Sequence, residues 1–345
     1  MRALADRTLV AVILAGGTGT RLYPASRSDR PKQFRAFGND RSLLARTADR
    51  VAFADETVVL TREAFADDVP DHAPDADVLV EPAARDTGPA LVYAAARLRE
   101  RFPDAVLCCV PSDHHVWGDF AGAARRAARV AAATDGLVTL GVEPTRPATE
   151  YGYIAPGPER ETTDGDAYAP VERFREKPDR EAAADLVADC YWNAGVFAWT
   201  PDAFLRECRG TPLAAVADAA DADDPDALRA AVEAVDPVSV DYAVMERTDD
   251  AYVVPAEMEW DDLGSWDALE RVLETDADGN AVLGDALTVD ASGTVVATGG
   301  EAHVSVVGAD DLVVAAYGDR VLVVPKAEAQ RVREVVDRLR EENSF

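Results

Sequence analysis

Charged side chains and a glycine-rich segment near the N-terminus could bind phosphate groups. The segment Leu14-Ala15-Gly16-Gly17-Thr18-Gly19 follows a short apolar run, and Arg21 comes two residues later. Glycines let backbone N–H groups approach a phosphate without interference from Cβ atoms. Arg21 can pair with phosphate oxygens at two points, and the ammonium of Lys32 could supply a further charge. A plain turn explains a lone glycine loop of this kind equally well.

The spacing of these glycines excludes two common nucleotide-binding designs. The segment does not match G-x-G-x-x-G, which disfavours a dinucleotide-binding fold. It also lacks the G-x-x-x-x-G-K-[ST] pattern of a P-loop. A phosphate site here would therefore belong to another class of nucleotide-binding protein.

Asp113 is placed where a protein could hold a metal ion. It comes directly after an apolar run, and open α/β sheets bind their ligands at the carboxyl ends of strands. A carboxylate at such a place can hold Mg²⁺. The ordinary alternative is that Asp113 caps the helix that follows.

Lys177 is a candidate for binding a second phosphate group. Lys32, Lys177 and Lys326 are the three lysines among 35 basic residues, so a surviving lysine is a candidate for a specific task. A lysine before a proline in a loop suits a phosphate point charge, although a solvated surface lysine is the alternative. Asn193 offers both a donor and an acceptor, as a sugar requires.

Short apolar runs alternate with helical patterns in the first part of the chain. This alternation predicts a parallel sheet with helices on both faces. The runs are Leu9–Leu14, Thr57–Leu60, Val78–Val80, Ala105–Val110 and Leu137–Gly141, and the helical patterns are Ser42–Arg50, Gly88–Arg101 and Phe120–Ala133. A less regular region follows, in which we expect residues 214 to 226 to form a loop or a weak helix.

A turn-rich stretch at Asp276–Asn280 marks a domain boundary. Short valine-rich runs separated by Gly and Asp follow it, and a helical pattern closes the chain at Ala327–Glu342. We therefore expect a larger α/β domain at residues 1–275 and a small, β-rich, β-helix-like domain at residues 276–345.

The charge of the chain excludes several classes of partner. The formal net charge is -29, with 64 acidic against 35 basic residues spread along the chain. This argues against nucleic acid and against an anionic membrane as partners. The acidic, lysine-poor composition is typical of cytosolic proteins of halophiles.

The four cysteines fit no zinc site, and no signal-peptide pattern is present, so we expect a cytoplasmic protein.

A set of motifs resembles the sugar-1-phosphate nucleotidyltransferase family, across residues 8 to 345. The motifs are Ala15-Gly16-Gly17-x-Gly19-x-Arg21-Leu22-x-Pro24, Pro31-Lys32-Gln33-Phe34, Glu81-Pro82-x-x-Arg85-Asp86-Thr87-Gly88-Pro89-Ala90, Pro111-Ser112-Asp113-His114, Glu150-Tyr151-Gly152-Tyr153-Ile154, Phe174-x-Glu176-Lys177-Pro178, Trp192-Asn193-x-Gly195-x-Phe197, Ser239–Glu246 and Trp260–Trp266. The Gln33-Phe34 ending is similar to the mannose-1-phosphate guanylyltransferase branch. The joint pattern is far more specific than any one motif.

This resemblance implies a fold, a reaction and partners. The fold would be α/β, with a Rossmann-like nucleotidyltransferase domain built on a mostly parallel sheet, followed by the small β-helix-like domain. The reaction would transfer GMP from GTP to mannose 1-phosphate and give GDP-mannose and pyrophosphate, with Mg²⁺ as cofactor. The resemblance also suggests a homodimer.

The resemblance further implies roles for individual residues. The nucleotide would be bound by Leu14, Ala15, Gly16, Gly17, Thr18, Gly19, Glu81, Arg85, Asp86 and Thr87, and the sugar by Gly152, Glu176 and Asn193. Arg21 and Lys32 would hold the leaving pyrophosphate, Lys177 the sugar phosphate, and Asp113 with Asp262 the metal. Asp86 and Gly88 depart from the Asn and Ala that are common in the family. Asp261 could cap the next helix or replace Asp262 as the ligand.

Two alternative functions follow from the same motifs. A related transferase could use another base or another sugar, although Pro31-Lys32-Gln33-Phe34 and Glu81–Ala90 favour guanine. A non-catalytic sugar-nucleotide sensor on this fold is the second alternative. Such a sensor should have lost Arg21, Asp113, Lys177 or Asp262, and all four are present.

Overall fold

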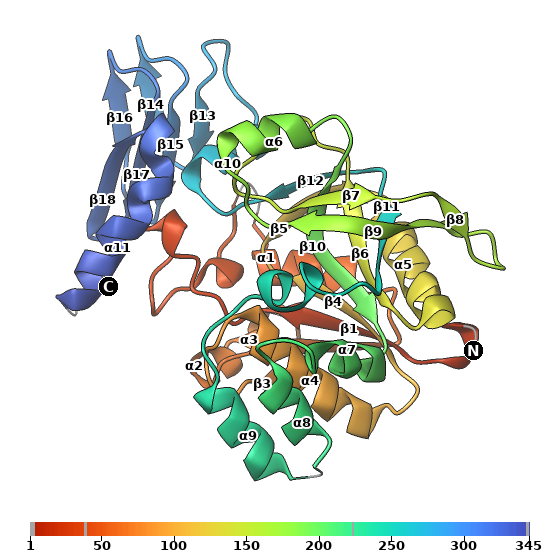
Figure 1. Ribbon diagram of the computed structural model, residues 1–345. Helices are drawn as coiled ribbons and strands as arrows, with labels where there is room; N and C mark the ends of the chain where they lie inside the picture. Colours follow the sequence, from red (N-terminus) through yellow and green to blue (C-terminus); the bar gives the residue numbers. More distant parts are fainter. Residues whose placement is uncertain (1–3, 38–39, 223, 343–344) are drawn as a thin grey trace. The chain divides into compact units, whose positions relative to one another are not determined.

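The computed structural model describes residues 4–37, 40–222, 224–342 and 345, and it divides into two compact units (Figure 1). The large unit comprises Met1–Gly16, Ala48–Pro111 and Val116–Trp260. The small unit comprises Gly17–Thr47, Ser112–His115 and Asp261–Phe345. The chain therefore enters the small unit three times, and the glycine loop is divided between the units after Gly16. The expected domain boundary after residue 275 stays a prediction.

The large unit is built on one extended sheet with the strand order β3-β2-β1-β4-β10-β6-β11-β9-β7. Strands β1, β2, β3 and β4 pair in parallel, and β11 pairs in parallel with β6. The bounds of the strands are β1 (Leu9–Leu14), β2 (Glu56–Thr61), β3 (Asp77–Val80), β4 (Val106–Pro111), β6 (Leu137–Val142), β7 (Tyr153–Pro156), β8 (Arg160–Glu161), β9 (Ala167–Arg175), β10 (Tyr191–Trp199) and β11 (Ala251–Pro255). The predicted α/β fold class is confirmed.

Two strands of the sheet, β9 and β10, run against this direction, which the apolar runs did not reveal. Strand β10 is antiparallel to both β4 and β6, and β9 is antiparallel to β11 and β7. A buried strand reads as a continuous apolar run in either direction, so its direction cannot be taken from its composition. The antiparallel strands matter for function because β10 carries Asn193.

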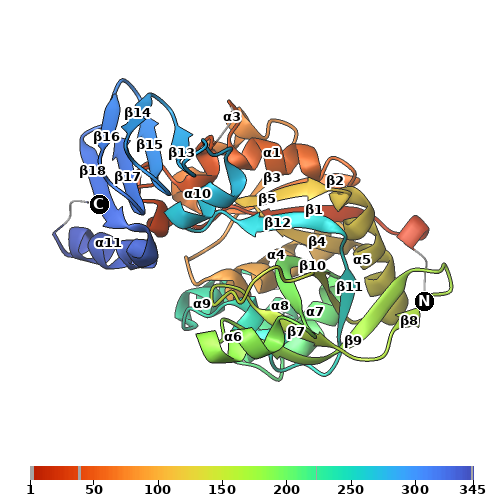
Figure 2. The same cartoon turned by 90° about the horizontal axis from the view of Figure 1, so that it is seen from above.

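Helices pack on both faces of this sheet, as predicted. Successive side chains of a strand point to opposite faces. Val10 and Val12 of β1 join the core under α4, whereas Ala11 and Ile13 are equally buried outside that core. Helices α4 (Thr87–Arg101), α7 (Pro201–Cys208), α8 (Ala214–Ala220) and α9 (Pro225–Ala234) lie together, and α5 (Phe120–Thr134) contacts β4, β6 and β10 (Figure 2). Helix α8 occupies part of the segment expected as a loop or a weak helix.

The short strands of the small unit form two sheets. One sheet has the order β13-β15-β17-β18, in which β13, β15 and β17 are parallel, and a second sheet pairs β14 with β16. The bounds are β13 (Ala281–Leu283), β14 (Ala286–Val289), β15 (Val295–Gly299), β16 (Val304–Val307), β17 (Leu312–Tyr317) and β18 (Arg320–Pro325). The predicted β-helix-like arrangement is therefore confirmed.

One apolar core joins these strands to the N-terminal segments of the small unit. Leu22, Leu43, Trp266 and Val313 are buried in it, together with side chains of α11 (Val332–Glu341). The Trp266 indole N–H donates to the Tyr23 carbonyl at 2.8 Å, which satisfies its polar atom in the core. Burial of this kind fixes the segment that carries Arg21 and Lys32.

Candidate active site

Two aspartates from distant parts of the sequence meet in the small unit. Asp113 lies in the turn between β4 and β5 (His114–Gly118), and Asp262 ends β12 (Met258–Asp262). Asp113, His114 and Asp262 each offer one ligand atom, and these atoms lie within 4.8 Å of one another. The structure therefore brings together the two carboxylates that the sequence pointed to as metal ligands.

Lys32 lies against both carboxylates. Its Nζ atom is 2.8 Å from Asp113 Oδ2 and 3.5 Å from Asp262 Oδ1. Lys32 is 2% exposed, so its ammonium is held at this place by the surrounding chain. Burial by itself would raise the pKa of Asp113, but the charges of Lys32, His114 and Arg21 lower that pKa to about 2. Asp113 is therefore a carboxylate at every physiological pH.

Arg21 approaches the same cluster from the other side of Asp262. Its Nη2 atom is 3.9 Å from Asp262 Oδ2. A Cβ atom at Gly264 would stand 2.9 Å from both the Arg21 Nη2 and the Asp262 Oδ2 atoms, so this contact needs glycine at position 264. Both cations of the N-terminal segment thus face the aspartate pair.

The neighbouring Asp261 is turned to a different partner. Its two carboxylate oxygens accept hydrogen bonds from Arg271 Nε at 2.6 Å and Nη2 at 3.0 Å. Ser265, rather than Asp261, stands at the N-cap of α10 (Trp266–Val272). The alternative role of Asp113 as a helix cap is also wrong, because Asp119 caps α5. Asp262 is therefore the member of its pair that faces Asp113.

The glycine loop is shaped around Lys32 in the small unit. Gly19 has a φ of 64°, and a Cβ atom there would lie 2.4 Å from the Lys32 Cβ atom. Any other residue at position 19 would be strained and would displace the lysine. A Cβ atom at Gly17 would meet nothing within 4 Å, so the backbone at this residue is open to a ligand.

Glu81 stands beside the start of the glycine loop in the large unit. Its Oε1 atom lies 2.6 Å from the position of a Cβ atom at Gly16 and 3.7 Å from Arg62 Nε. Burial raises the pKa of Glu81 to about 7, with Arg62 lowering it and Asp86 raising it further. Leu14 and Ala15 are held nearby, because the Ala15 N–H donates to the Leu60 carbonyl at 2.8 Å. The sequence pattern did not point to Arg62.

Asp86 and its neighbours shape the start of α4. The Asp86 carboxylate caps the helix by accepting a hydrogen bond from the Thr87 N–H at 2.7 Å. The backbone of Asp86 has a φ of 69°. The Thr87 hydroxyl accepts from the Val240 N–H at 3.0 Å, and the Arg85 guanidinium donates to the Glu233 carbonyl. Of the two acids that the resemblance places at the nucleotide, Asp86 thus has a capping bond, whereas Glu81 has a salt-bridge partner.

The residues that the resemblance assigned to the sugar lie together in the large unit. Lys177, with a φ of 43°, forms an ion pair with Glu176 Oε1. The residue Glu176 is 8% exposed, and its Oε2 atom is buried without a hydrogen-bond partner. A Cβ atom at Gly152 would stand 2.5 Å from this oxygen. A buried acceptor that lacks a partner, beside a glycine that leaves room, is typical of a ligand hydroxyl site.

Asn193 is engaged in a network that includes one further acid. Its Oδ1 atom accepts from the Thr139 hydroxyl at 2.8 Å and from the Gly195 N–H at 3.1 Å. Its Nδ2 atom donates to Asp241 Oδ1 at 2.8 Å. Sequence reasoning missed Asp241 as a site residue, although it lies in the motif Ser239–Glu246. The contact with Asn193 could not be read from the sequence spacing.

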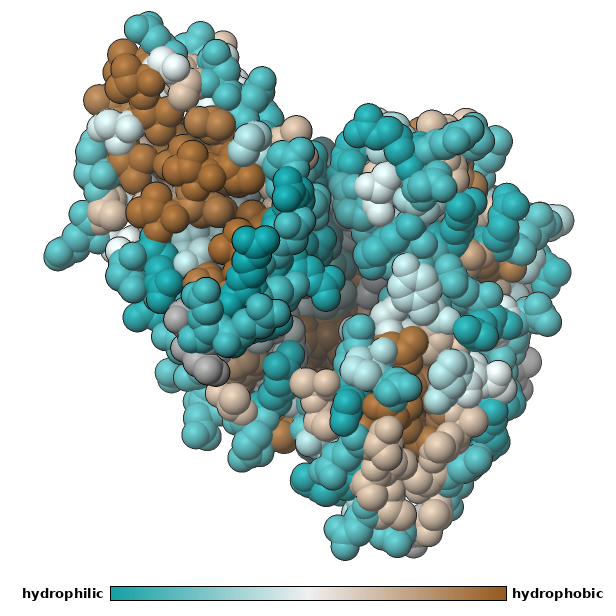
Figure 3. All heavy atoms as spheres, turned by 60° about the vertical axis from the view of Figure 1, so that its left-hand side comes forward, coloured by the Kyte–Doolittle hydropathy of each residue, from teal (hydrophilic) through white to brown (hydrophobic). Residues whose placement is uncertain are grey.

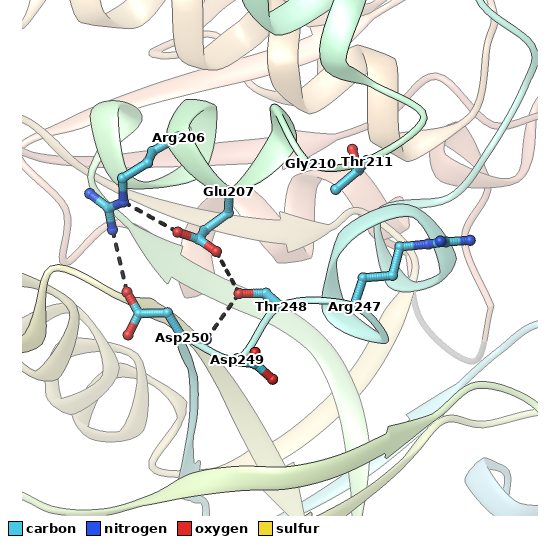
Figure 4. Close-up of a pocket in the computed structure, with 8 residues that line it drawn as sticks. All are labelled: Arg206, Glu207, Gly210, Thr211, Arg247, Thr248, Asp249 and Asp250. Carbon is cyan, nitrogen blue, oxygen red and sulfur yellow. Dashed lines mark hydrogen bonds and ion pairs between the residues drawn. The ribbon is translucent and has the colours of Figure 1, made fainter.

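A separate polar depression of about 440 Å³ lies elsewhere on the large unit (Figure 4). Arg206 pairs there with Glu207 at 3.2 Å and with Asp250 at 3.4 Å, and the Thr248 hydroxyl donates to Glu207 at 2.7 Å. These charges satisfy one another. The depression includes none of the residues that the sequence predicted for the site.

Two protein-family models match this chain. The nucleotidyl transferase model matches residues 10–279, and a model of the MannoseP isomerase/GMP-like beta-helix domain matches residues 284–339. The first match covers more than half of the chain. Within the described residues, no helix has both the length and the apolar character needed to cross a bilayer.

Relatives of known name cover nearly the whole chain. The chain is 36% identical to the xanthan biosynthesis protein XanB of Xanthomonas campestris over 96% of its own length and 73% of the relative. It is 36% identical to a mannose-1-phosphate guanylyltransferase of Sinorhizobium fredii over 96% of the chain and 68% of the relative. A solved structure described as a mannose-1-phosphate geranyltransferase of Thermus thermophilus matches with a TM-score of 0.85 and 36% identity, over 96% of this chain and 99% of that one.

Proposed function

Because the chain belongs to the nucleotidyl transferase family, we propose that it transfers GMP from GTP to mannose 1-phosphate and releases pyrophosphate. The family membership confirms the resemblance found in the sequence motifs. One structural observation supports catalysis over ligand binding alone. Lys32 and Arg21 face the carboxylates of Asp113 and Asp262, and a sensor without chemistry would not need to keep this set.

The chemistry needs positioning and charge neutralisation more than proton transfer. An oxygen of the sugar phosphate attacks the α-phosphorus of GTP, a new phosphorus–oxygen bond forms, and the bond to the β-phosphate oxygen breaks. The attacking oxygen is already an anion at neutral pH, so no general base is required. The main obstacle is the repulsion between two anions, which the cationic side chains offset.

Asp113 and Asp262 fit a Mg²⁺ ion. Two carboxylates with ligand atoms within 4.8 Å of each other and of a His114 nitrogen form a suitable oxygen-rich set. When bound, the ion would supply positive charge at the phosphates. Lys32 and Arg21 offset the charge of the two carboxylates, and both side chains would hold the leaving pyrophosphate.

The glycine loop and Glu81 would bind the nucleotide. Backbone N–H groups of residues 14 to 19 suit phosphate oxygens, and the backbone at Gly17 has open space beside it. Guanine presents two adjacent N–H groups that can donate hydrogen bonds to a carboxylate. The buried carboxylate of Glu81, next to Gly16, supports its role as the reader of the base. Arg85, Asp86 and Thr87 would support the same segment.

Lys177, Glu176 and Gly152 would bind the sugar phosphate. The ion pair between Lys177 and Glu176 holds the lysine where a phosphate could replace the carboxylate as its partner. The free Oε2 atom of Glu176 would accept a sugar hydroxyl in the space beside Gly152. Asn193, whose amide is already engaged, would act by holding its neighbours in place.

The small unit carries an apolar face on which we infer that a second copy of the chain docks. Val307, Val321 and Val323 are each more than 60% exposed, and Leu287 and Val289 are also exposed. Figure 3 shows that apolar side chains gather over the small unit on this face. Monomeric proteins rarely leave such aliphatic patches uncovered. Two copies of a chain with a charge of -29 repel each other. A face of uncharged side chains such as this one lets them meet without placing like charges in contact.

We also infer a cytoplasmic setting of high salt. All four cysteines are free and buried, which suits a reducing compartment. High salt would screen the repulsion among the surface carboxylates.

The reverse reaction tests the proposed function. Pyrophosphate, a magnesium salt and a sugar nucleotide are mixed with the protein, and formation of the nucleoside triphosphate is followed. GDP-mannose should yield GTP and mannose 1-phosphate faster than GDP-glucose, UDP-glucose or ADP-glucose is cleaved. Equal cleavage of all four, or of none, would refute the proposal.

A further inference from the structure

Asp241 is held in one fixed orientation by Asn193. It is the first residue of the π-helical turn η4 (Asp241–Met245), and its Oδ1 atom accepts from Asn193 Nδ2 at 2.8 Å. The Oδ1 atom of Asn193 already accepts from the Thr139 hydroxyl and the Gly195 N–H. Because both of these groups are donors, the amide of Asn193 must present its nitrogen to Asp241.

The charged and titratable groups near Asp241 and Glu176 come from three segments of the large unit. Glu176 and Lys177 follow β9, Asp86 caps α4, and Tyr242 and Glu246 lie in or just after η4. Lys177 is attracted by the carboxylates of Glu176 and Asp241, and Glu176 is in turn repelled by those of Glu246 and Asp86. Lys177 forms its ion pair with Glu176, and the backbone N–H of Glu176 donates to Glu246 Oε1 at 2.8 Å.

Entry of a sugar phosphate would disturb this balance. The phosphate needs Lys177, and Lys177 then no longer neutralises Glu176. Two neighbouring carboxyl groups with no cation between them cannot both stay ionised at low cost in a buried place. One proton taken up from solvent removes the repulsion.

We propose that Asp241 is a positioning residue that accepts this proton when mannose 1-phosphate binds, so that uptake of the sugar phosphate is coupled to protonation. The inference rests on the proposed function, since it takes the sugar phosphate as the ligand of Lys177. A protonated Asp241 keeps its hydrogen bond from Asn193 through the carbonyl oxygen and has an O–H to donate toward Glu176.

The electrostatics fix the direction of the pH dependence. Burial raises the pKa of Asp241 to about 7, and Glu176 adds to this rise, whereas Lys177 and Asn193 oppose it. Below this pH the proton is already present in the free protein. Above it, each pH unit should weaken mannose 1-phosphate binding about tenfold, as expected for uptake of one proton. The phosphate group itself titrates near pH 6 and so adds no slope in the alkaline range.

Three proteins separate this role from a merely structural one: the wild type, Asp241→Asn and Asp241→Ala. The KM for mannose 1-phosphate and the kcat are measured from pH 6.5 to pH 9 at saturating GTP. Asn reproduces the neutral acid, so Asp241→Asn should keep a low KM that no longer rises with pH. Asp241→Ala loses the contact with Asn193 and should show a raised KM at every pH. Asp249→Asn, at an exposed acid near the polar depression, is the control and should follow the wild type.

A second measurement on the wild type covers the case in which a variant fails to fold. Calorimetric titration of mannose 1-phosphate at pH 8, in buffers of different ionisation enthalpy, should show uptake of about one proton. No proton uptake, or an Asp241→Asn variant with the wild-type slope, would overturn the inference. Both results presuppose a wild type that turns over GTP and mannose 1-phosphate at pH 7. Loss of that turnover would instead refute the proposed function.

Discussion

Lys32 Nζ lies 2.8 Å from Asp113 Oδ2 and is almost wholly buried. This contact joins residues from two separate segments of the chain and places a fixed positive charge against a carboxylate whose pKa is lowered to about 2. A second carboxylate, that of Asp262, shares the lysine at 3.5 Å. Lys32 thus lies against both carboxylates that we propose as ligands of a divalent ion.

The two aspartates that face Lys32 should be needed for catalysis, whereas their neighbour should not. Asp113→Asn and Asp262→Asn each remove one ligand charge and should lower kcat by about 10²–10³ with a smaller effect on GTP affinity. Asp261→Asn breaks the contact with Arg271 and should mainly lower the melting temperature. Steady-state kinetics and thermal unfolding of the three variants check this. A collapse of kcat in Asp261→Asn alone would make Asp261, and not Asp262, the catalytic acid of the pair.

Gly152→Ala should impair binding of the sugar phosphate and spare GTP. A Cβ atom at Gly152 would lie 2.5 Å from Glu176 Oε2 and so would fill the place proposed for a sugar hydroxyl. We expect the KM for mannose 1-phosphate to rise at least about tenfold, the equivalent of one lost hydrogen bond to a charged group. Gly210→Ala is the matched control, because a Cβ atom at Gly210 meets nothing within 4 Å. A Gly152→Ala variant with normal KM would place the sugar elsewhere.

Discrimination between GTP and ATP should depend on the charge of Glu81. Burial raises the pKa of Glu81 to about 7. The carboxylate accepts from guanine, so the preference for GTP should be full above this pH and should fall as Glu81 is protonated below it. An unpaired acceptor should penalise adenine by about 1–3 kcal/mol.

The ratio of kcat/KM for GTP and ATP, measured on both sides of pH 7, checks the role of Glu81. Glu81→Gln should lower this ratio at every pH, and Glu63→Gln, at an exposed acid of α2 (Glu63–Ala66), should leave it unchanged. An unchanged ratio in Glu81→Gln would move base recognition to another group.

Dimerisation should depend on the apolar face of the small unit. A carboxylate at the centre of a self-contact meets its copy across the interface, so Val307→Asp and Val321→Asp should make the chain monomeric. Sedimentation velocity measures the change. Val78→Asp, at a partly exposed valine of β3 in the large unit, is the control and should stay dimeric. A wild type that is monomeric at micromolar concentration would contradict the role of this face.

Stability should rise steeply with salt. The charge of -29 destabilises the folded state in dilute buffer, and ions screen this repulsion. The melting temperature should therefore increase continuously as KCl is raised into the molar range. A melting temperature that is the same at low and at molar KCl would exclude an adaptation to high salt.

The sequence predicted the elements of this fold better than the partners within the site. Apolar runs located β1 and β4, and the valine-rich repeats located the small stacked strands, because burial periodicity is a local signal. The direction of β10 depends on contacts between distant segments. So does the position of Lys32 between Asp113 and Asp262. Asp241 was not predicted as a site residue for the same reason, since it lies in η4 and its partner Asn193 lies in β10. Local motifs thus indicate which residues are present, but not which of them touch.

The most direct test of the account is the forward reaction in a matrix of substrates. Initial rates of pyrophosphate release are measured with GTP, ATP, UTP and dTTP, each against mannose 1-phosphate and glucose 1-phosphate, in the presence of MgCl₂ and molar KCl. We expect the highest kcat/KM for GTP with mannose 1-phosphate and loss of that rate in Asp262→Asn. Equal rates with ATP and GTP, or a rate that survives in Asp262→Asn, would contradict the proposed function.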